Sequence, residues 1–444
     1  TVTPGTITAN GNPTASTDSP FDDPAGFVFG ENEDQNVIKC GSYEGNGSST
    51  GPEIFLGWEP SFLILKNSSA SENWFMYDSM RGIAASGDDK QLFPNLNNAE
   101  GTTDHLELTS TGFKIVGSDA NINGNGNTII YCAVRRPDGY VGKPPELGTD
   151  VFAMDTGNSS STIPAFDSGF PVDFALNRQP ATSESWYAGA RLIQGKFLMT
   201  NGNNAQGSAP NYLFSDNNGW RKDSWINTDY QSWMWKRHAG FDVVTWTGNE
   251  TAGRQIEHSL NAVPEMMWVK NRGGQQSWAV YHKGLNGGTN PEQYRLLLNV
   301  NSAESDDNTV WDDTAPTSSE FTIGDSHKVS ENGYWHMGML FASVDGISKV
   351  GSYTGNESSS GPTVTLGFAP RLIILKSTAG ASDWYVLDTL RGLASGDDKR
   401  LSLNDSSSQD TGDYIDPSST GFQIVTSWDQ FNKNNTTFIY YAHA

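Results

Sequence analysis

The chain has 444 residues, which is too long for a single hydrophobic core, so several domains are expected. Its 47 glycines, 11% aromatic residues and only 18% charged residues are typical of a turn-rich all-β protein and argue against a helical or disordered chain. The net charge of −23 argues against a basic face for nucleic acid, and no apolar run approaches the ~20 residues of a membrane span, so no membrane insertion is expected.

The N-terminal stretch, residues 1–35, is rich in Thr, Pro, Asn, Gly and Asp and has no periodicity. Each proline restricts the residue before it to extended conformations. We therefore predict an extended N-terminal arm, which either lies along a neighbouring subunit or is a loose terminus.

An internal repeat organises the rest of the chain. The segment 41–52 (GSYEGNGSSTGP) recurs as 351–362 (GSYTGNESSSGP), with nine of the twelve residues identical. Each is followed by a Gly-aromatic-x-Pro sequence and an apolar strand. Because a repeat this clear decides the fold, we interpret the Gly-Asn-x-Ser-Ser loop as a folding signature that starts each domain, and not as a phosphate or nucleophile loop.

Two more degenerate copies complete the pattern. Each copy offers six or more short strands between Gly and Asn turns. The sequence predicts an all-β fold of four tandem β-sandwich, jelly-roll-like domains of about 100 residues each. Short spacers between copies predict fixed contacts between neighbours, in an elongated or pairwise-packed arrangement. The predicted copies are 36–138, 139–239 (the most degenerate), 240–346 and 347–444.

Two features predict the domain cores. The run from Phe62 to Leu65 is continuously apolar, as expected of a strand buried on both faces. One tryptophan recurs in register in every copy, which places it in a core. These tryptophans are Trp74, Trp186, Trp278 and Trp384.

Other tryptophans fall in irregular segments and are candidates for exposure. Flat sugar faces pack on aromatic rings, so these residues are the candidates for ligand binding. Packing against a neighbouring copy or subunit is the alternative. The candidates are Trp220, Trp225, Trp311 and Trp428.

Paired carboxylates in two polar turns are the candidates for calcium binding. Asp88 and Asp89 in the first copy match Asp397 and Asp398 in the fourth. Calcium takes six to eight oxygen ligands, but no D-x-D-x-D-G loop accompanies these turns, and a solvated Asp turn explains them equally well. We expect no metal and no cofactor.

No catalytic constellation emerges from the sequence. The segment 47–51 matches G-x-S-x-G, yet it lies in a hairpin without the strand and helix that a nucleophile elbow needs. The seven histidines show no metal-ligand spacing. Asp78 with Arg81, and Asp388 with Arg391, predict a structural ion pair at a strand end. A non-enzymatic protein is expected.

The two cysteines, Cys40 and Cys132, fall on the predicted first and last strands of the first copy. Two cysteines form neither a disulfide scaffold nor a zinc site. We expect two buried thiols, although a disulfide is geometrically possible if those strands pair.

Several segments resemble virion structural proteins of marine and cyanobacterial tailed phages. In those proteins such sequence segments recur within repeated β-sandwich modules of tail-fibre-like proteins. The resemblance implies a particle component and brings no catalytic residues. The segments that carry it are 141–155 (VGKPPELGTDVFAMD), 278–285 (WAVYHKGL), 340–346 (LFASVDG) and 351–356 (GSYTGN).

From this resemblance we expect a bacteriophage virion protein, assembled in the host cytoplasm, that forms a tail fibre, a tail-associated part or another surface appendage. Its expected partners are sister chains in a homo-oligomer, as the resemblance suggests a trimer, together with other virion proteins and host-surface glycans for attachment. The alternatives are a carbohydrate-binding adhesin array, a capsid-decorating protein and a depolymerase, the last of which would need paired carboxylates in a groove.

Overall fold

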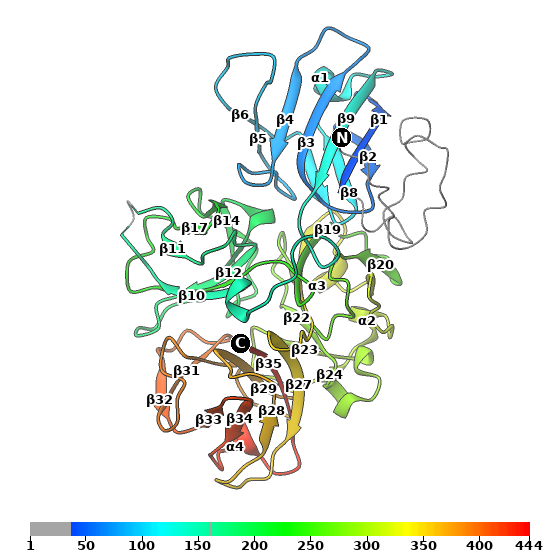
Figure 1. Ribbon diagram of the computed structural model, residues 1–444. Helices are drawn as coiled ribbons and strands as arrows, with labels where there is room; N and C mark the ends of the chain where they lie inside the picture. The colour runs from blue at the N-terminus through cyan, green and yellow to red at the C-terminus, as the bar shows by residue number, and fades with distance from the viewer. Residues whose placement is uncertain (1–36, 160–161) are drawn as a thin grey trace, which may run out of the picture. The chain divides into compact units, whose positions relative to one another are not determined.

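The computed structural model describes residues 37–159 and 162–444. Within these ranges the fold is all-β, as predicted, with four tandem β-sandwiches and only short helices (Figure 1). No described helix is long and apolar enough to cross a membrane. The predicted arm at residues 1–35 lies outside the described residues.

The fourth copy shows the plan that all copies share. A six-stranded antiparallel sheet has the order β27-β35-β29-β30-β31-β32, and a three-stranded sheet, β28-β34-β33, covers one side of it. The last strand of the copy therefore lies between its first and third strands. The elements are β27 (Ser348–Thr354), β28 (Thr363–Thr365), β29 (Leu372–Ser377), β30 (Tyr385–Asp388), β31 (Asp398–Ser402), β32 (Asp410–Gly412), β33 (Ile415–Ser418), β34 (Gly421–Ile424), α4 (Asp429–Asn432) and β35 (Thr437–His443).

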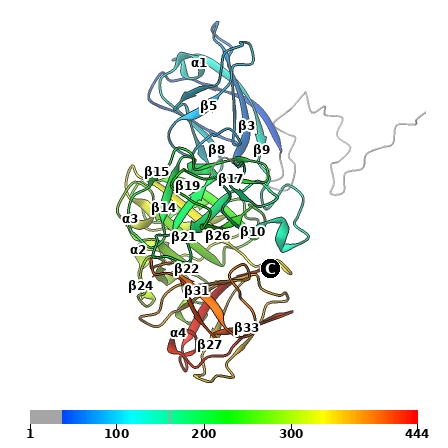
Figure 2. The same ribbon diagram turned by 90° about the vertical axis from the view of Figure 1, so that its left-hand side faces the viewer.

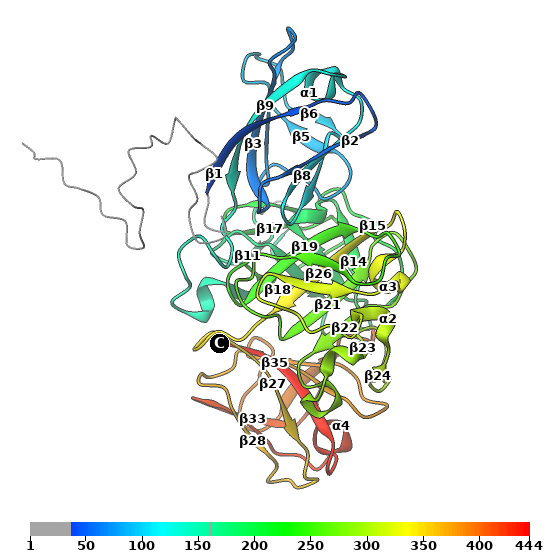
Figure 3. The ribbon, with the colours of Figure 1, turned by 90° about the vertical axis from the view of Figure 1, so that its right-hand side faces the viewer.

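The first copy has a four-stranded sheet, β1-β9-β3-β4, against the three-stranded sheet β2-β8-β7, and a separate pair, β5-β6. Figure 3 shows β1, β9 and β3 side by side, with β2 and β8 in the other layer. The elements are β1 (Ile38–Glu44), β2 (Thr50–Phe55), β3 (Pro60–Asn67), β4 (Trp74–Asp78), β5 (Asp89–Gln91), β6 (Gly101–Thr103), β7 (Leu106–Thr109), β8 (Gly112–Val116), α1 (Ala120–Asn123) and β9 (Thr128–Arg135).

The second copy repeats the plan as β10-β18-β12-β13-β14-β15 over β11-β17-β16. The elements are the 3-10 turn η2 (Gly148–Asp150), β10 (Phe152–Thr156), β11 (Phe166–Asp167), β12 (Phe174–Arg178), β13 (Tyr187–Ala190), η3 (Arg191–Ile193), β14 (Lys196–Met199), β15 (Gly207–Ser208), β16 (Leu213–Asp216), β17 (Gly219–Arg221) and β18 (Gln231–Trp235).

The third copy pairs β19-β26-β21-β22-β23-β24 with the two-stranded sheet β20-β25. The elements are β19 (Phe241–Thr247), β20 (Arg254–Glu257), β21 (Met266–Asn271), β22 (Ala279–His282), η4 (Leu285–Gly288), η5 (Pro291–Gln293), β23 (Tyr294–Leu297), β24 (Ser305–Asp306), α2 (Asn308–Trp311), β25 (Glu320–Ile323), α3 (His327–Ser330) and β26 (Trp335–Phe341).

The loop that opens the fourth copy is held by one buried asparagine. Asn432, just before β35, donates to the carbonyls of Ser358 (2.7 Å) and Thr426 (2.8 Å), and its side-chain oxygen accepts from the amide of Asn356 (2.8 Å). Asn123 makes the same three bonds in the first copy. These bonds support the interpretation of the loop as a folding signature.

Replacing Asn432 by alanine is expected to destabilise the fourth copy by about 2 to 3 kcal/mol, because it leaves buried backbone groups without a partner. Thermal unfolding followed by circular dichroism measures the loss. The exposed Asn434→Ala is the control and should change stability by less than about 0.5 kcal/mol. An equal effect of both variants would contradict this role.

The large sheets of the second, third and fourth copies are buried on both faces. In β29, Ile373 and Leu375 point into the sandwich of their own copy, while Leu372 and Ile374 join a core shared between copies. We call this shared set the central core. It includes Phe174, Leu176, Trp233, Trp235, Phe241, Met266, Trp268, Phe341, Leu372, Ile374 and Tyr441.

Aromatic contacts connect the three copies within the central core. Trp235 of the second copy lies 6.1 Å from Phe241 of the third, and Phe341 of the third lies 4.9 Å from Tyr441 of the fourth, measured between ring centroids. The indole N–H of Trp235 donates to the Tyr441 hydroxyl at 3.2 Å. Figures 1 and 2 show the green second copy, the yellow-green third copy and the orange-red fourth copy adjoining one another.

Candidate functional site

Three of the recurring tryptophans dock one copy onto the next. Each is fully buried or nearly so, and its indole N–H donates to a backbone carbonyl of another copy. Trp186 of the second copy bonds Ser402 of the fourth (2.7 Å), Trp384 of the fourth bonds Leu297 of the third (2.9 Å), and Trp278 of the third bonds Met199 of the second (2.8 Å). The three contacts therefore close a cycle, which we call the three-copy interface.

The acceptors in this cycle occupy equivalent positions, each at the last residue of β14, β23 or β31. An asparagine two residues later accepts from the backbone amide of the tryptophan in its own copy. The pairs are Trp186 with Asn201 (3.1 Å), Trp278 with Asn299 (3.0 Å), Trp384 with Asn404 (2.8 Å) and Trp74 with Asn95 (3.0 Å). These acceptors were not predicted from the sequence, although the recurring asparagine could have marked them.

A buried cation supports the same interface. Arg178 at the end of β12 donates to the carbonyls of Asp405, Ser406 and Ser407 in the fourth copy. Lys270, at the equivalent place in the third copy, donates to the carbonyl of Asn203 in the second at 3.2 Å. Burial lowers the pKa of Arg178 to about 10 and that of Lys270 to about 7. The expected pairwise packing is thus extended by direct contact between the second and fourth copies.

The first copy stands outside this cycle, and the prediction that Trp74 belongs to a core is wrong. Trp74 is 37% exposed, whereas its three counterparts are buried. Phe62 and Ile64 are also only partly buried, so β3 is covered on one face and not on both. Trp74 does occupy the same strand position as the other three tryptophans. Among the described residues, however, no other copy packs on its side of the sheet.

The expectation of two buried thiols is wrong for the same reason. Cys40 and Cys132 lie directly opposite each other on β1 and β9, on the uncovered side of the sheet. Both are free thiols; Cys40 is exposed and Cys132 partly exposed. Burial and the neighbouring Cys40 raise the pKa of the Cys132 thiol.

A buried ion-pair network joins the first copy to the second and third copies, through Arg237 and Asp242 respectively. Glu59 forms an ion pair with Arg136 (3.0 Å) and accepts from Arg237 (2.8 Å), and Asp242 pairs with the same two guanidinium groups at 2.8 and 3.3 Å. No side chain of the four is more than 7% exposed. Burial would raise the pKa of Asp242, but Arg136, Arg237 and the Ser259 amide hold it below its usual value.

A second contact between copies contains a histidine that is kept neutral. His282 accepts at Nδ1 from the Gly284 amide (2.9 Å), so its Nε2–H donates to the carbonyl of Tyr440 in the fourth copy (3.3 Å). Burial lowers the pKa of His282 to about 3. Protonation at Nδ1 would place its new N–H against the Gly284 amide, so that two hydrogen-bond donors would face each other.

Acid is therefore expected to weaken the protein through His282. Below the unfolded-state pKa of about 6.5, His282 is protonated in the unfolded chain but stays neutral in the folded chain. The free energy of unfolding therefore falls as the pH is lowered towards 3. The slope is up to about 1.4 kcal/mol per pH unit for this group. Urea unfolding of His282→Gln between pH 4 and 6 should show a correspondingly flatter dependence than the wild type.

The exposed His327→Gln is the control for this experiment, because its side chain lies at the surface. A pH dependence in His282→Gln equal to that of the wild type would contradict the assignment.

Two of the four tryptophans proposed for ligand binding are buried, which corrects that prediction. Trp220 lies on β17, stacks on Phe214 and donates to the Ser232 hydroxyl at 3.0 Å. Trp311 lies at the end of α2 and packs against Tyr281. Both segments looked irregular in sequence because these elements are only three and four residues long.

The other two tryptophans, Trp225 and Trp428, are exposed to a similar degree. The Trp428 ring is already covered, because the guanidinium of Arg400 lies 4.7 Å from its centroid. Trp225 instead packs against other rings, with centroid distances of 4.6 Å to Tyr187, 5.9 Å to Phe197 and 6.2 Å to Tyr230. Among the four candidates, Trp225 is the one whose surroundings leave it suited to stacking on a sugar.

The calcium candidates divide into an inward and an outward pair. Asp89 is buried and accepts from the amides of Ala84, His105 and Leu106, and burial raises its pKa. Asp398 does the same in the fourth copy, accepting from Ala394, Tyr414 and Ile415, with its pKa raised to about 6 by burial. Asp88 and Asp397 are exposed. The inward carboxylates hold their turns in place and are occupied by backbone donors.

The ion pairs predicted at strand ends are confirmed. The Arg81 side chain donates to Asp78 at 2.6 Å, and the Arg391 side chain donates to Asp388 at 2.7 Å. In the fourth copy the same carboxylate also accepts from the indole N–H of Trp233 in the second copy, at 3.0 Å. The pair thus contributes to the three-copy interface.

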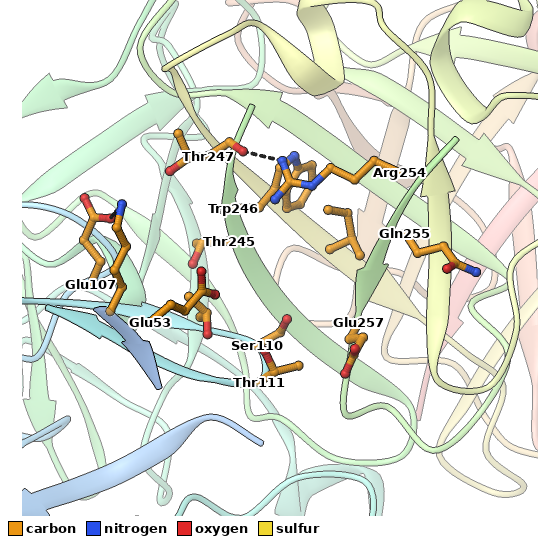
Figure 4. A pocket seen from close by; sticks show the side chains of 13 residues that line it. Glu53, Glu107, Ser110, Thr111, Thr245, Trp246, Thr247, Arg254, Gln255 and Glu257 are labelled. Carbon is orange, nitrogen blue, oxygen red and sulfur yellow. Dashed lines mark hydrogen bonds and ion pairs between the residues drawn. The ribbon is translucent and has the colours of Figure 1, made fainter. Parts of the chain in front are cut away.

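A pocket of about 210 Å³ lies between the first and third copies (Figure 4). Glu53 and Glu107 come from the first copy, and Arg254 and Glu257 from β20 of the third. Arg254 donates to the carbonyl of Thr247 at 2.5 Å. Burial and the neighbouring Glu320 raise the pKa of Glu257. These carboxylates are the residue type that polysaccharide cleavage would use.

A metal centre finds no support in residues 37–159 and 162–444. No group of three or more His, Cys, Asp or Glu side chains in these ranges is placed to hold a metal ion. The glutamates of the pocket are likewise not part of any such group.

Comparison with protein families gives one result. A model described as a domain of unknown function (DUF7483) matches residues 9–136 and 226–444, which is more than half of the chain. The chain belongs to this family. The DUF7483 match omits residues 137–225, which hold β10 to β17 together with Trp220 and Trp225. No curated protein matches the chain.

Proposed function

We propose that the chain is a non-enzymatic structural protein of a tailed-phage particle, forming a tail fibre, a tail-associated part or another surface appendage. The observation that carries the proposal is the three-copy interface, in which buried tryptophans join three sandwiches through backbone carbonyls. Such contacts stabilise a rigid scaffold and leave the opposite loops at the surface. The resemblance of several segments to phage virion proteins supports the same role.

Immunogold electron microscopy of purified particles tests the location. Antibodies raised against the purified chain should label the tail or an appendage of particles that encode it. Labelling on the head would favour the capsid-decorating alternative, and intact particles without label would contradict the proposal.

The non-enzymatic part of the proposal is tested on host polysaccharide. The purified chain should leave the polymer length unchanged in size-exclusion chromatography. Cleavage that is lost in Glu53→Gln or Glu257→Gln would overturn this part and place the activity in the pocket between the first and third copies.

One observation favours glycan contact as a second role. Trp225 offers an exposed ring beside Tyr187 and Phe197, in the segment that the family match omits. We expect Trp225→Ala to weaken binding to host-surface glycans at least tenfold on a glycan array, a loss of about 1.4 kcal/mol. Trp428→Ala is the matched control, because Arg400 covers that ring. Equal binding by both variants, or none by the wild type, would count against this role.

A further inference from the structure

The first copy presents an apolar sheet surface that the other copies bury. We call it the open face, the outward side of the sheet β1-β9-β3-β4. Its most exposed apolar members are Ile38 (60%), Ile130 (40%) and Trp74 (37%). Contiguous apolar patches of this kind on a protein surface mark interaction sites. The apolar and thiol side chains of the open face are those of Ile38, Cys40, Phe62, Ile64, Trp74, Met76, Ile130, Cys132 and Val134, and the same registers place the polar side chains of Ser42, Glu44, Lys66, Asp78 and Thr128 on this side.

Strand register shows what the open face corresponds to. Across the first copy, Cys40 pairs with Cys132, which pairs with Ile64. The same row in the fourth copy runs Val350, Tyr441, Ile374. All three residues of that fourth-copy row are at most 2% exposed and belong to the central core. The open face is therefore the counterpart of a surface that meets two other copies elsewhere in the chain.

The sequence of the open face is that of a buried surface. The run from Phe62 to Leu65 has the same continuous apolar character as Leu372 to Leu375, which is buried on both sides. A strand with one side in solvent would alternate apolar with polar residues. The first copy has therefore kept a pattern suited to a covered sheet.

The donor and acceptor of a docking contact are also in place. Trp74 has the same backbone anchor on Asn95 as its buried counterparts have on their own asparagines. Phe93, two residues before Asn95, is the equivalent of Ser402, Leu297 and Met199. Its carbonyl accepts from the Leu96 amide at 2.9 Å, just as the Ser402 carbonyl accepts from Asp405. A carbonyl oxygen has a second lone pair, so it can also accept from an indole.

We propose that three chains associate through their open faces into a homotrimer that repeats the three-copy interface, with Trp74 of each chain donating to the carbonyl of Phe93 in the next. The occupant is a second copy of this chain, because repeats of the same chain cover the equivalent face of the fourth copy. The number is three, because three copies close the cycle within the chain. The inference rests on the proposed function only in treating sister chains as partners.

The oligomeric state of the full chain tests the proposal. Sedimentation velocity and native mass spectrometry should find a trimer for the wild type and a monomer for Ile130→Glu, which places a charge in the middle of the open face. Val263→Glu is the matched control, because Val263 is as exposed as Ile130 but lies in the third copy. It should remain trimeric, and circular dichroism should show all variants folded.

Trp74→Phe tests the predicted hydrogen bond separately from folding. It keeps a six-membered aromatic ring but removes the N–H together with the five-membered ring that carries it, so the trimer should dissociate at a concentration at least tenfold higher than the wild type. A wild type that is monomeric or dimeric at all concentrations, or a trimeric Ile130→Glu, would overturn the proposal. So would unchanged dissociation of Trp74→Phe.

The two cysteines give a direct readout of the surface, because they are the only thiols of the chain and both lie on the open face. Alkylation of Cys40 should slow at least tenfold as the protein concentration is raised into the trimer range. It should stay fast in Ile130→Glu. Alkylation that does not depend on concentration would contradict the interface.

These results separate the trimer from the function. A trimer whose antibodies label no particle would leave the interface standing and remove the virion role. Labelled particles together with a monomeric purified chain would support the virion role and remove the trimer interface.

Discussion

Trp278→Ala is expected to lower the free energy of unfolding by about 3 to 5 kcal/mol, the cost of removing a fully buried tryptophan from a core. The indole is completely buried, and its N–H is bonded to the carbonyl of Met199 in the second copy. The variant therefore leaves a cavity at the three-copy interface and removes one of the two hydrogen bonds to the Met199 carbonyl, which still accepts from the Gly202 amide at 3.4 Å. Urea unfolding followed by circular dichroism measures the loss.

The control for Trp278→Ala lies in the same copy. Trp335 is partly exposed, so Trp335→Ala should cost less than about 1 kcal/mol. Hydrogen exchange should also rise on both sides of the lost contact, around β14 as well as β22, because the tryptophan belongs to one copy and its acceptor to another. Faster exchange in the third copy alone would contradict a docking role.

Asp242→Ala is expected to destabilise the protein by about 3 to 5 kcal/mol, because it leaves Arg136 and Arg237 buried with one carboxylate between them. Asp242 also accepts from the Ser259 amide at 2.9 Å, so that donor loses its partner too. Since Asp242 has a depressed pKa in the folded chain, its contribution is complete above an unfolded pKa of about 3.9 and is lost only as the pH falls below that value.

The measurement is urea unfolding at pH 7, with Glu146→Ala as the control. Glu146 forms an exposed ion pair with Lys143 at 2.8 Å, and exposed pairs contribute about 0 to 1 kcal/mol. The large effect should also separate the first copy from the third, so protease cleavage near Arg136 should accelerate. A loss as small as that of the control would show that the network does not hold the copies together.

The fold was predictable because the repeat is strong and the strands are short apolar runs between turns. The loop beginning at Gly351 and its partner at Gly41 were correctly interpreted as folding signatures, and Asn432 gives the reason. The strand-end ion pair of Asp388 was also predictable, because its spacing recurs.

What the sequence could not predict is which side of a sheet another copy covers. Trp74 and Trp384 occupy equivalent positions, yet one is exposed and the other buried, because burial depends on contacts between copies and not on register. Trp220 and Trp311 were misjudged for a related reason. Their strand and helix are too short to produce a periodic pattern, so buried residues looked like loop residues.

The position of β35 has a consequence for the order in which the chain can fold. This strand, Thr437–His443, lies inside the fourth sheet, and Tyr441 belongs to the core that the second and third copies share. A ribosome must therefore deliver β35 before Trp235 of the second copy and Phe341 of the third can make their contacts with Tyr441. Until then the second and third copies, about 200 residues, keep apolar surface exposed. This part of the nascent chain is therefore expected to depend on chaperones and to complete its folding late.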